Sequence, residues 1–499
     1  MKILLIFPFC QNPHYPIYLP SENLGLAYIA AYLRKNGLSV DILDANMHEW
    51  TSKKIITEVD ITQYSFCGIG VSSHLLLNET LKISKEIKSI NPACHMTIGG
   101  HFATFQAQRI LENGLNIDSV VMRDGEKTML DLIKNLSWTK NLENILGLCF
   151  RDKSGNIKIN NSRPLIQELD SLPWPARDTL LYLKEMSHSW PTQISSSRGC
   201  YGSCTYCDMS NFYRRSWRAR SAKDVVDEIE YLNKEYGSRV FRFSDDEFIG
   251  PKPRGPKRAR EIALEILKRN LAVELMIDAR AQAIDRELFS LLKDAGVIDC
   301  LVGVESGVDR ILKLYNKGMT TKDNLKAIQV LKDLGISLNL AFIMIDPRMT
   351  FEELKANYHF LKKNDIVTSY SLKTWLWPLH GTTLIKQLKL QGLVVKDKLE
   401  QIEYRFIDSD VEKIFNVIKK IKNYCYPLER EIFICMKHGF LSEDDLKKEI
   451  NDEKKLWIEI FETILNNPEW DNYESLKIKV KCQIDNVRKK CLKQKEDEK

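Results

Sequence analysis

Short apolar runs alternate with amphipathic stretches along most of this chain, in two separate series. The first series occupies residues 1–152. Units of this kind build a parallel sheet with right-handed crossovers, and ligands bind at the carboxyl ends of its strands. The sequence therefore predicts an α/β domain with a ligand site at that edge. Its expected strands are Ile3–Phe7, Val40–Asp44, Gly68–Ser72, Met96–Ile98 and Val120–Met122. Its expected helices are Leu24–Asn36, Glu79–Ile90 and Thr128–Asn135.

The second series occupies residues 192–392. It contains roughly six strand and helix units, fewer than the eight of a complete (β/α)8 barrel. The sequence therefore predicts a partial (β/α)6 barrel. Its expected strands are Gln193–Ser197, Val240–Phe243, Val273–Ile277, Cys300–Val304, Ser337–Ile345 and Thr368–Thr374. Its expected helices are Ala222–Tyr236, Arg258–Asn270, Arg286–Ala295, Lys322–Leu334 and Phe351–Lys363.

Two further segments complete the expected organisation. Residues 153–191 are expected to form a linker, and its Pro-interrupted stretch Leu172–Pro175 is a poor candidate for regular structure. Residues 393–499 are rich in Lys, Glu, Ile and Leu. They are predicted to be mainly helical and to shape the substrate site at the barrel mouth.

The composition argues against some classes of binding partner and against a membrane-spanning chain. The 499 residues include 73 Lys and Arg against 67 Asp and Glu, a formal charge of +6 that is small for a dedicated nucleic-acid binder. No apolar stretch approaches the roughly 20 residues that span a bilayer, and Met1–Cys10 lacks the features of a signal peptide. We expect a cytoplasmic protein with no transmembrane segment and no nucleic-acid partner. Its twelve cysteines are then thiols or metal ligands.

Three cysteines, Cys200, Cys204 and Cys207, stand in a C-x3-C-x2-C spacing just after an expected strand. Three thiolates that converge from one loop can bind three irons of a [4Fe-4S] cluster and leave one iron open to an exogenous ligand. A zinc site completed by a His or a distant Cys is one alternative, and three unligated thiols are the other. The spacing favours the cluster.

This triplet, with Tyr206 directly before its third cysteine, resembles the signature of the radical S-adenosylmethionine (SAM) superfamily. The expected barrel resembles that family's fold. The resemblance implies that SAM chelates the open iron and that Tyr206 belongs to the cofactor site. It also implies that reduction cleaves SAM to a 5′-deoxyadenosyl radical, which abstracts a hydrogen atom from the substrate. The cofactors supply this chemistry while the protein binds, aims and shields.

Three strand ends of the second series carry the SAM contacts that the resemblance implies. Ser244, Asp245 and Asp246 follow the second strand and are assigned to the SAM amino group. Arg280 ends the third strand and is assigned to the SAM carboxylate, and Glu305 ends the fourth and is assigned to the ribose. The alternatives are a solvated turn for the acidic run and a structural ion pair for the last two residues.

Two positions depart from the family's pattern. His380 stands at the second Pro of a P-x-P-G-T element that closes this class of barrel, and Asp346 stands where Gly is common. Both lie near the expected substrate side. The departures therefore concern substrate specificity rather than SAM cleavage.

Small residues follow the strands of the first series, at Gly68–Ser73, Gly99–Gly100 and Asp124–Glu126. Such residues let a flat ligand approach the backbone closely, although tight βα turns also need glycine. Together and in this order they resemble the cobalamin-binding domain that precedes the barrel in B12-dependent radical SAM enzymes. The resemblance implies a Rossmann-like domain. The cobalamin contacts that it implies are Ser73, Gly99, Gly100, Gly125 and Glu126.

The D-x-H-x-x-G segment that supplies a histidine below cobalt in other cobalamin proteins is absent. Gln11–Pro16 stands in its place. Cobalt is therefore expected to have no protein histidine beneath it, unless the His14 side chain reaches the metal. His74 and His101 are interpreted as polar residues of the pocket or the surface.

The resemblance implies an oxygen-sensitive enzyme that uses a [4Fe-4S] cluster, SAM and cobalamin to methylate an unactivated carbon. One SAM gives the radical, and a second supplies the methyl group by way of cobalamin. The expected partners are a small-molecule or peptide substrate and a flavodoxin or ferredoxin that donates electrons. One alternative is a radical SAM enzyme for cyclisation, rearrangement or C–C bond formation, with cobalamin redirected or absent. The other is a non-catalytic regulatory protein with a structural metal.

Overall fold

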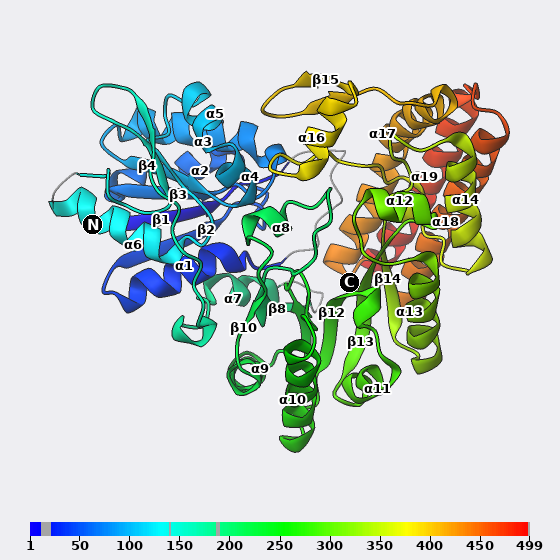
Figure 1. Cartoon of the computed structure of the whole chain (residues 1–499), viewed down its shortest axis with the longest axis horizontal. Coiled ribbons are helices and arrows are strands. Elements are labelled where there is room, and N and C mark those ends of the chain that lie inside the picture. Colours follow the sequence, from blue (N-terminus) through cyan, green and yellow to red (C-terminus); the bar gives the residue numbers. More distant parts are fainter. Residues whose placement is uncertain (11–20, 139–140, 186–189, 498–499) are drawn as a thin grey trace.

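The computed structural model describes residues 1–10, 21–138, 141–185 and 190–497. Its parts follow one another across the molecule in sequence order (Figure 1). An N-terminal α/β domain in blue and cyan is followed by a central barrel in green and by C-terminal elements in yellow to red. This arrangement confirms the predicted architecture. The Gln11–Pro16 segment, with His14, lies outside the described residues.

The N-terminal domain is built on a seven-stranded sheet in the order β2-β1-β3-β4-β5-β6-β7. Strands β1 to β5 are parallel, whereas β6 and β7 join the edge in antiparallel fashion. Residues Ile3–Ile6 of β1 are all buried, as expected for a strand covered by helices on both faces. The strands are Lys2–Phe7 (β1), Ser39–Asp44 (β2), Phe66–Gly70 (β3), His95–Gly99 (β4), Ser119–Val121 (β5), Leu148–Arg151 (β6) and Ile157–Ile159 (β7).

Helices cover both faces of this sheet. Helices α1 and α6 share a hydrophobic core with one face, and α2, α3 and α5 share another core with the opposite face. Helix α1 begins where the Asn23 side chain accepts a hydrogen bond from the Leu26 amide at 3.0 Å, which satisfies a free donor of the first turn. The helices are Leu24–Lys35 (α1), Ser52–Glu58 (α2), Leu77–Ile90 (α3), His101–Phe105 (α4), Ala107–Asn113 (α5) and Glu126–Trp138 (α6).

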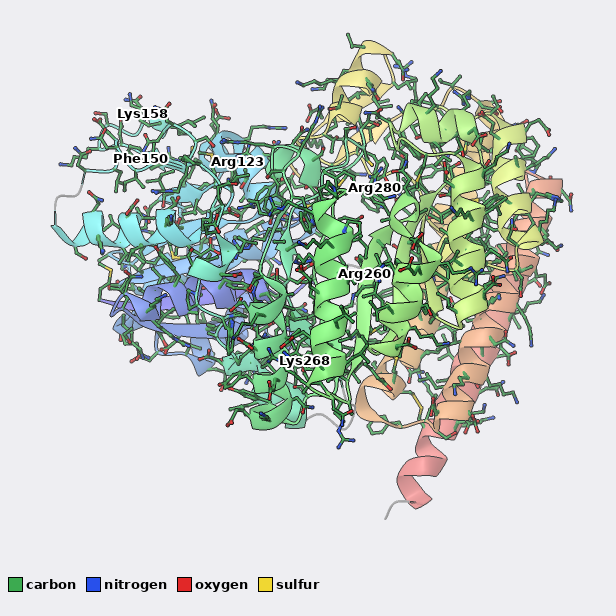
Figure 2. All side chains as sticks on the ribbon, turned by 60° about the horizontal axis from the view of Figure 1, so that its bottom comes forward. Arg123, Phe150, Lys158, Arg260, Lys268 and Arg280 are labelled. Atoms are coloured by element: carbon green, nitrogen blue, oxygen red, sulfur yellow. A yellow bond between two sulfur atoms is a disulfide. The ribbon has the colours of Figure 1, made fainter. Side chains whose placement is uncertain are left out.

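The expected linker, residues 153–191, contains two regular elements that the sequence did not predict. Strand β7 lies inside it and pairs with β6, so Lys158 lies on the outermost strand of the sheet (Figure 2). Helix α7 (Asp178–Glu185) also lies inside it. Strand β7 has only 3 residues, two of them exposed, so it lacks the alternating apolar pattern that identifies a strand.

The central domain is an open barrel of parallel strands in the order β14-β13-β12-β11-β8. Its core includes the fully buried rings of Phe241, Phe243 and Phe289. The strands are Thr192–Ile194 (β8), Val240–Phe243 (β11), Glu274–Arg280 (β12), Val297–Glu305 (β13) and Ser337–Phe342 (β14). Ser197–Arg198 (β9) and Arg218–Ala219 (β10) form a separate antiparallel pair. The helices are Met209–Phe212 (α8), Ala222–Tyr236 (α9), Arg254–Lys268 (α10), Arg286–Asp294 (α11), Asp309–Leu314 (α12), Thr321–Leu334 (α13) and Phe351–Lys363 (α14).

The sixth expected strand, Thr368–Thr374, is wrong. Ser369–Leu372 instead forms a short helix, α15, because the Thr368 hydroxyl accepts a hydrogen bond from the Ser371 amide at 2.9 Å and completes a capping box. A single parallel bridge between Ile345 and Trp375 continues the barrel beyond β14.

The C-terminal segment is mainly helical, as predicted. Helix α16 (Thr383–Leu390) and a hairpin of β15 (Val394–Asp397) and β16 (Ile402–Tyr404) lead into three long helices. Lys373 ties these helices to the barrel, because its buried ammonium lies 2.7 Å from Glu429 and 3.2 Å from Glu453. Within the described ranges, no helix is both long and apolar enough to cross a membrane. The long helices are Ser409–His438 (α17), Glu443–Asn466 (α18) and Tyr473–Asp497 (α19).

A disulfide between Cys435 and Cys491 corrects the expectation that the C-terminal cysteines are all thiols. The two residues are 56 positions apart, and their proximity arises only when α17 packs against α19. Cys425 is a buried thiol and Cys482 an exposed one.

Candidate functional site

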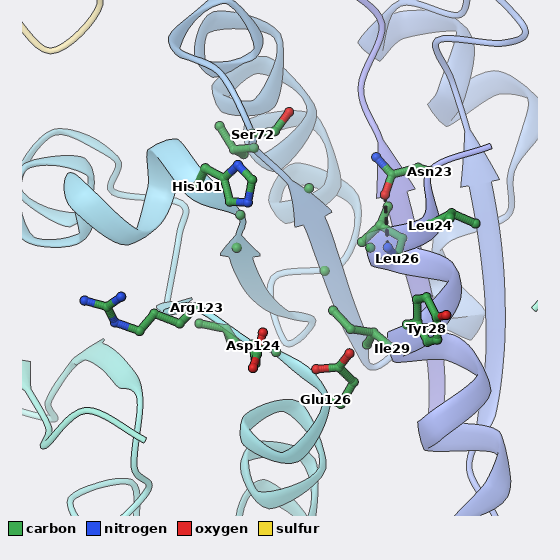
Figure 3. A pocket seen from close by; sticks show the side chains of 18 of the residues that line it. Asn23, Leu24, Leu26, Tyr28, Ile29, Ser72, His101, Arg123, Asp124 and Glu126 are labelled. Atoms are coloured by element: carbon green, nitrogen blue, oxygen red, sulfur yellow. Dashed lines mark hydrogen bonds between the residues drawn. The ribbon is translucent and has the colours of Figure 1, made fainter. Parts of the chain in front are cut away.

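A cavity of about 390 Å³ lies where the carboxyl ends of β1, β3, β4 and β5 face the barrel. Figure 3 shows its N-terminal side, with Tyr28 and Ile29 of α1 on one flank and His101 across from them at the end of β4. The cavity therefore belongs to both domains. The barrel contributes Ser195, Ser197, Arg198, Phe212, Tyr213, Ser244 and Asp246 to its lining.

Glycines form the floor of this cavity. Gly100 has a φ of +113°, and a Cβ atom there would lie 2.8 Å from the carbonyl oxygen of Val71. A Cβ atom on Gly125 would lie 2.9 Å from Cδ1 of Ile29. The turn after β4 thus requires glycine, and both turns leave the backbone accessible to a flat ligand.

The structure brings four of the five predicted cobalamin contacts together. Gly99, Gly100, Gly125 and Glu126 all line the cavity. Ser73 does not line it; its hydroxyl accepts a hydrogen bond from the Leu75 amide at 3.3 Å and caps the next turn. Its neighbour in the sequence, Ser72, lines the cavity instead.

Buried ion pairs join the two domains beside the cavity. Arg198 of β9 lies 2.7 Å from Glu126 and 3.5 Å from Asp124, and Arg218 of β10 lies 2.7 Å from Asp124. Burial alone would raise the pKa of Asp124, but the two guanidinium groups outweigh it and lower that pKa. Neither arginine is among the site residues predicted from the sequence. Arg198 stands two positions before Cys200, which is the one signal that would have singled it out.

A second ion-pair group closes the cavity near α1. Arg177 lies 2.7 Å from Glu22 and 2.8 Å from Glu228, and all three side chains are buried. The Arg177 guanidinium therefore forms ion pairs with two carboxylates. Burial raises the pKa of Glu22 to about 7, despite the attraction of Arg177.

This raised pKa gives a testable pH dependence. A folded Glu22 with a pKa near 7 keeps a proton that the unfolded chain, at 4.5, has lost, so stability falls as pH rises through that window. We expect Glu22→Gln to remove part of this fall, measured as the Tm of the apo protein at pH 5 and at pH 8. The exposed Glu143→Gln variant is the control. A wild-type difference in Tm that Glu22→Gln leaves unchanged would contradict the assignment.

Two carboxylate oxygens in the lining are free acceptors. Within the described part of the chain, Oε1 of Glu22 and Oε2 of Glu126 are buried without a hydrogen-bond partner. Cobalamin carries amide side chains whose N–H groups are suitable donors. Together with the glycine floor, these residues fit cobalamin.

The histidines near the cavity are neutral. Burial lowers the pKa of His101 and of His74 to about 4. The His101 ring packs against Phe212, with ring centroids 4.2 Å apart. His101 lines the cavity, in keeping with its interpretation as a pocket residue.

The three predicted cluster ligands lie on one loop, Cys200–Cys207, which follows β9. Cys204 is buried, and Cys200 and Cys207 are half-buried. The Gly202 amide donates to Sγ of Cys200 at 3.3 Å, and Nη1 of Arg280 lies 3.6 Å from Sγ of Cys204. Such donors stabilise thiolate sulfur, and burial raises the pKa of Cys200 when no iron is bound. These residues fit the iron-sulfur cluster.

No group of three His, Cys, Asp or Glu side chains in the described ranges is arranged to hold a single metal ion. Cluster ligands differ in this respect, because each cysteine binds a different iron. The loop is held on its other side by Thr205, whose amide donates to the carbonyl of Tyr315 at 2.9 Å.

The acidic residues Asp245 and Asp246, which follow β11, have different roles. The Asp245 carboxylate accepts hydrogen bonds from the Ser196 amide at 2.7 Å and the Ser197 hydroxyl at 2.8 Å, so it fixes the strand that precedes the cysteine loop. Asp246 accepts from the Gly199 amide at 3.0 Å and, like Ser244, lines the cavity.

The two other predicted SAM contacts each have a partner that sequence reasoning missed. Arg280 lies at the end of β12, with its amide 2.8 Å from a carboxylate oxygen of the fully buried Glu247. Glu305 ends β13 and lies 2.8 Å from the ammonium of Lys317. Lys317 also donates to the hydroxyl of Tyr206 at 3.3 Å. The predicted cofactor residues are therefore connected through Lys317.

Comparisons with known proteins agree with both halves of this site. Residues 17–133 match the B12 binding domain and residues 194–361 match the radical SAM superfamily. An uncharacterised methyltransferase of Pyrococcus horikoshii, PH0819, is 30% identical over 454 residues, which cover 88% of this chain and 96% of that protein. The anaerobic magnesium-protoporphyrin IX monomethyl ester cyclase of Rubrivivax gelatinosus is 28% identical over 389 residues, covering 76% of this chain and 68% of the cyclase.

A solved structure shares the whole fold. The cobalamin-dependent S-adenosylmethionine radical enzyme OxsB, with aqua-cobalamin bound, aligns with a TM-score of 0.79 at 20% identity, covering 100% of this chain and 81% of that one. The order of the two domains, the cavity between them and the cysteine loop agree with these matches. The chain therefore belongs to the cobalamin-dependent radical SAM enzymes, whose cofactors are a [4Fe-4S] cluster, SAM and cobalamin.

Proposed function

We propose that this enzyme transfers a methyl group from SAM, by way of cobalamin, to an unactivated carbon of a small-molecule substrate. The observation that carries the proposal is the shared cavity. Its floor is the glycine-lined edge of the N-terminal sheet, and its opposite wall includes Ser244 and Asp246 of the barrel. A cobalamin held on that floor would face the SAM site, as group transfer between the two cofactors requires. The similarity to PH0819 over nearly its full length supports the same reaction class.

The cofactors supply reductive SAM cleavage and methyl transfer, and the protein's residues position them. Cys200, Cys204 and Cys207 would hold the cluster. Arg280 offers a guanidinium for the SAM carboxylate, and Glu305 offers a carboxylate for the ribose hydroxyls.

Exclusion of water is the second task of the chain. The cavity wall includes Tyr28, Phe212 and Tyr213, and the two rings from the barrel lie edge to face at 4.7 Å. The Arg198 guanidinium lies 4.8 Å from the centre of the Tyr28 ring and closes the wall between the domains. Aromatic side chains in such a wall help to exclude water from a substrate radical.

Radical cyclisation, rearrangement or C–C bond formation is the second candidate. The similarity to the Rubrivivax gelatinosus cyclase favours it, because that relative aligns with 76% of this chain at 28% identity. The two reactions differ in their SAM products. Methyl transfer yields S-adenosylhomocysteine together with 5′-deoxyadenosine, whereas cyclisation yields 5′-deoxyadenosine with little S-adenosylhomocysteine.

The test is anaerobic reconstitution with iron, sulfide and hydroxocobalamin, followed by desalting, absorbance spectra and quantitation of SAM products under a strong reductant. Retained cobalamin, 5′-deoxyadenosine and methyl transfer to cobalt are expected. Deoxyadenosine without retained cobalamin would overturn the methylation proposal and favour the cyclase. We further propose a flavodoxin or ferredoxin as the reductant and the cytoplasm as the location. Replacing the chemical reductant with purified flavodoxin tests the first of these.

A further inference from the structure

A turn outside the predicted motifs holds the cysteine loop in place. This α12 turn, Tyr315–Lys317, follows helix α12 directly. The carbonyl of Tyr315 accepts the Thr205 amide at 2.9 Å, and the Asn316 side chain donates to the hydroxyl of Ser203 at 2.8 Å. The turn therefore fixes the position of the loop that carries the cluster cysteines.

Lys317 ends this turn and contacts the predicted SAM residues. Its ammonium lies 2.8 Å from Oε1 of Glu305 and 3.3 Å from the hydroxyl of Tyr206. Its carbonyl accepts a hydrogen bond from Nη2 of Arg280, and Nη1 of that arginine lies 3.6 Å from Sγ of Cys204. One residue thus links the carboxylate assigned to the ribose, the guanidinium assigned to the SAM carboxylate and the cysteine loop.

Two backbone features lie beside this ammonium, at Gly303 and at Glu305. A Cβ atom on Gly303 would lie 2.6 Å from Nζ of Lys317 and 2.8 Å from Oε1 of Glu305, so a larger residue there would displace the ends of both side chains. Glu305 itself has a φ of +65°, an uncommon conformation for a residue with a side chain. Such strain persists where the surrounding structure determines it, and it clusters at functional sites.

The pair is deeply buried and charged. The side chains of Lys317 and Glu305 are only 6% and 9% exposed. Burial by itself would lower the pKa of Lys317, but the attraction of Glu305 outweighs burial and raises it. The ammonium is therefore present at neutral pH, and it interacts electrostatically with Cys204 in a region of low dielectric constant.

We propose that Lys317 is a positioning residue for SAM cleavage. Its ammonium holds the Glu305 carboxylate in the orientation that binds the SAM ribose, and its positive charge stabilises the reduced cluster. The proposal rests on the cofactors of the family and is independent of whether the product is methylated or cyclised.

The experiment compares reconstituted wild-type enzyme with Lys317→Met, Glu305→Gln and the exposed neighbour Lys313→Met. The first measurement is the cluster's midpoint potential without SAM, by anaerobic spectroelectrochemistry. Removing the cation should shift the potential to a more negative value, whereas removing the anion should shift it to a less negative one. Lys313→Met, on the solvent side of α12, should leave it unchanged.

The second measurement is equilibrium SAM binding to the oxidised holoenzyme. Lys317→Met should bind SAM about tenfold more weakly, the effect of losing one charge-assisted hydrogen bond. Lys317→Arg should restore much of the affinity, because it keeps the charge and the donors.

Opposite shifts of the potential, with weaker SAM binding, would support the proposal. Potentials that move in the same direction in Lys317→Met and Glu305→Gln would overturn it, as would an unchanged SAM affinity in Lys317→Met. Where Lys317→Met takes up no iron, Lys317→Gln carries the same test with a side chain that still donates a hydrogen bond. A wild-type enzyme that cleaves SAM but does not methylate would overturn the proposed function alone, and both measurements would stand.

Discussion

Cys204→Ala should abolish reductive SAM cleavage and prevent the enzyme from retaining a [4Fe-4S] cluster. Cys204 is the buried member of the triplet, and Arg280 directs a donor toward its sulfur at 3.6 Å. Without this thiolate, one iron loses its protein ligand inside a site that contains no replacement within the C-x3-C-x2-C spacing. The expected readouts are loss of iron, loss of the brown absorbance after desalting and no 5′-deoxyadenosine.

The matched control is Cys482→Ala, which removes an exposed free thiol in α19. This variant should take up iron and cleave SAM as the wild type does. If Cys204→Ala retains a cluster that still cleaves SAM, the assignment of Cys204 as a ligand is contradicted. Another cysteine of the chain would then have to bind that iron.

Gly70→Leu should weaken cobalamin binding while SAM cleavage continues. Gly70 ends β3 in the cavity lining, and a Cβ atom there would meet Leu26 at 3.5 Å, an ordinary contact. The rest of a leucine side chain would occupy space that the ligand needs. Overpacking of this kind costs about 1–3 kcal/mol, so hydroxocobalamin affinity should fall by about tenfold or more.

Gly70→Ala is the control, because its methyl group fits the contact distance and requires no unusual φ. It should retain cobalamin, measured by absorbance after desalting. Gly70→Leu should still produce 5′-deoxyadenosine from the intact barrel. Normal cobalamin retention by Gly70→Leu would show that the corrin lies elsewhere.

The sequence predicted the two α/β series because local patterns define them. Phe351–Lys363 is a helix with the predicted bounds, since Thr350 and Glu353 complete a capping box that local sequence specifies. The Thr368–Thr374 prediction failed at a similar cap, because the Thr368 hydroxyl starts a helical turn in a segment whose β-branched and aromatic residues favour a strand. Strand β7 was missed because its pairing with β6 depends on the rest of the sheet.

Only the site residues that belong to a local sequence motif could be predicted. The cysteine spacing and the strand-end glycines are contiguous signals, and most of those glycines line the cavity. Lys317, Arg198 and Arg218 act through partners that are distant in the sequence: Lys317 meets Tyr206 across 111 positions, and Arg218 meets Asp124 across 94. No local pattern encodes such pairs, since each charge acquires its partner only when the fold brings the segments together.

The buried ion pairs between the domains also limit how this enzyme can be recombined. Arg198 and Arg218 belong to the barrel half, and their partners Glu126 and Asp124 belong to the N-terminal half. In a chimera that takes residues 1–152 from another enzyme, both arginines would be buried without a partner. The exception is an enzyme that has acidic residues at the positions of Asp124 and Glu126. An unpaired buried charge costs about 3–5 kcal/mol, a large share of the stability of a folded protein. Exchange of cobalamin-binding modules between such enzymes therefore requires transplanting the charges on both sides of the junction as a single unit.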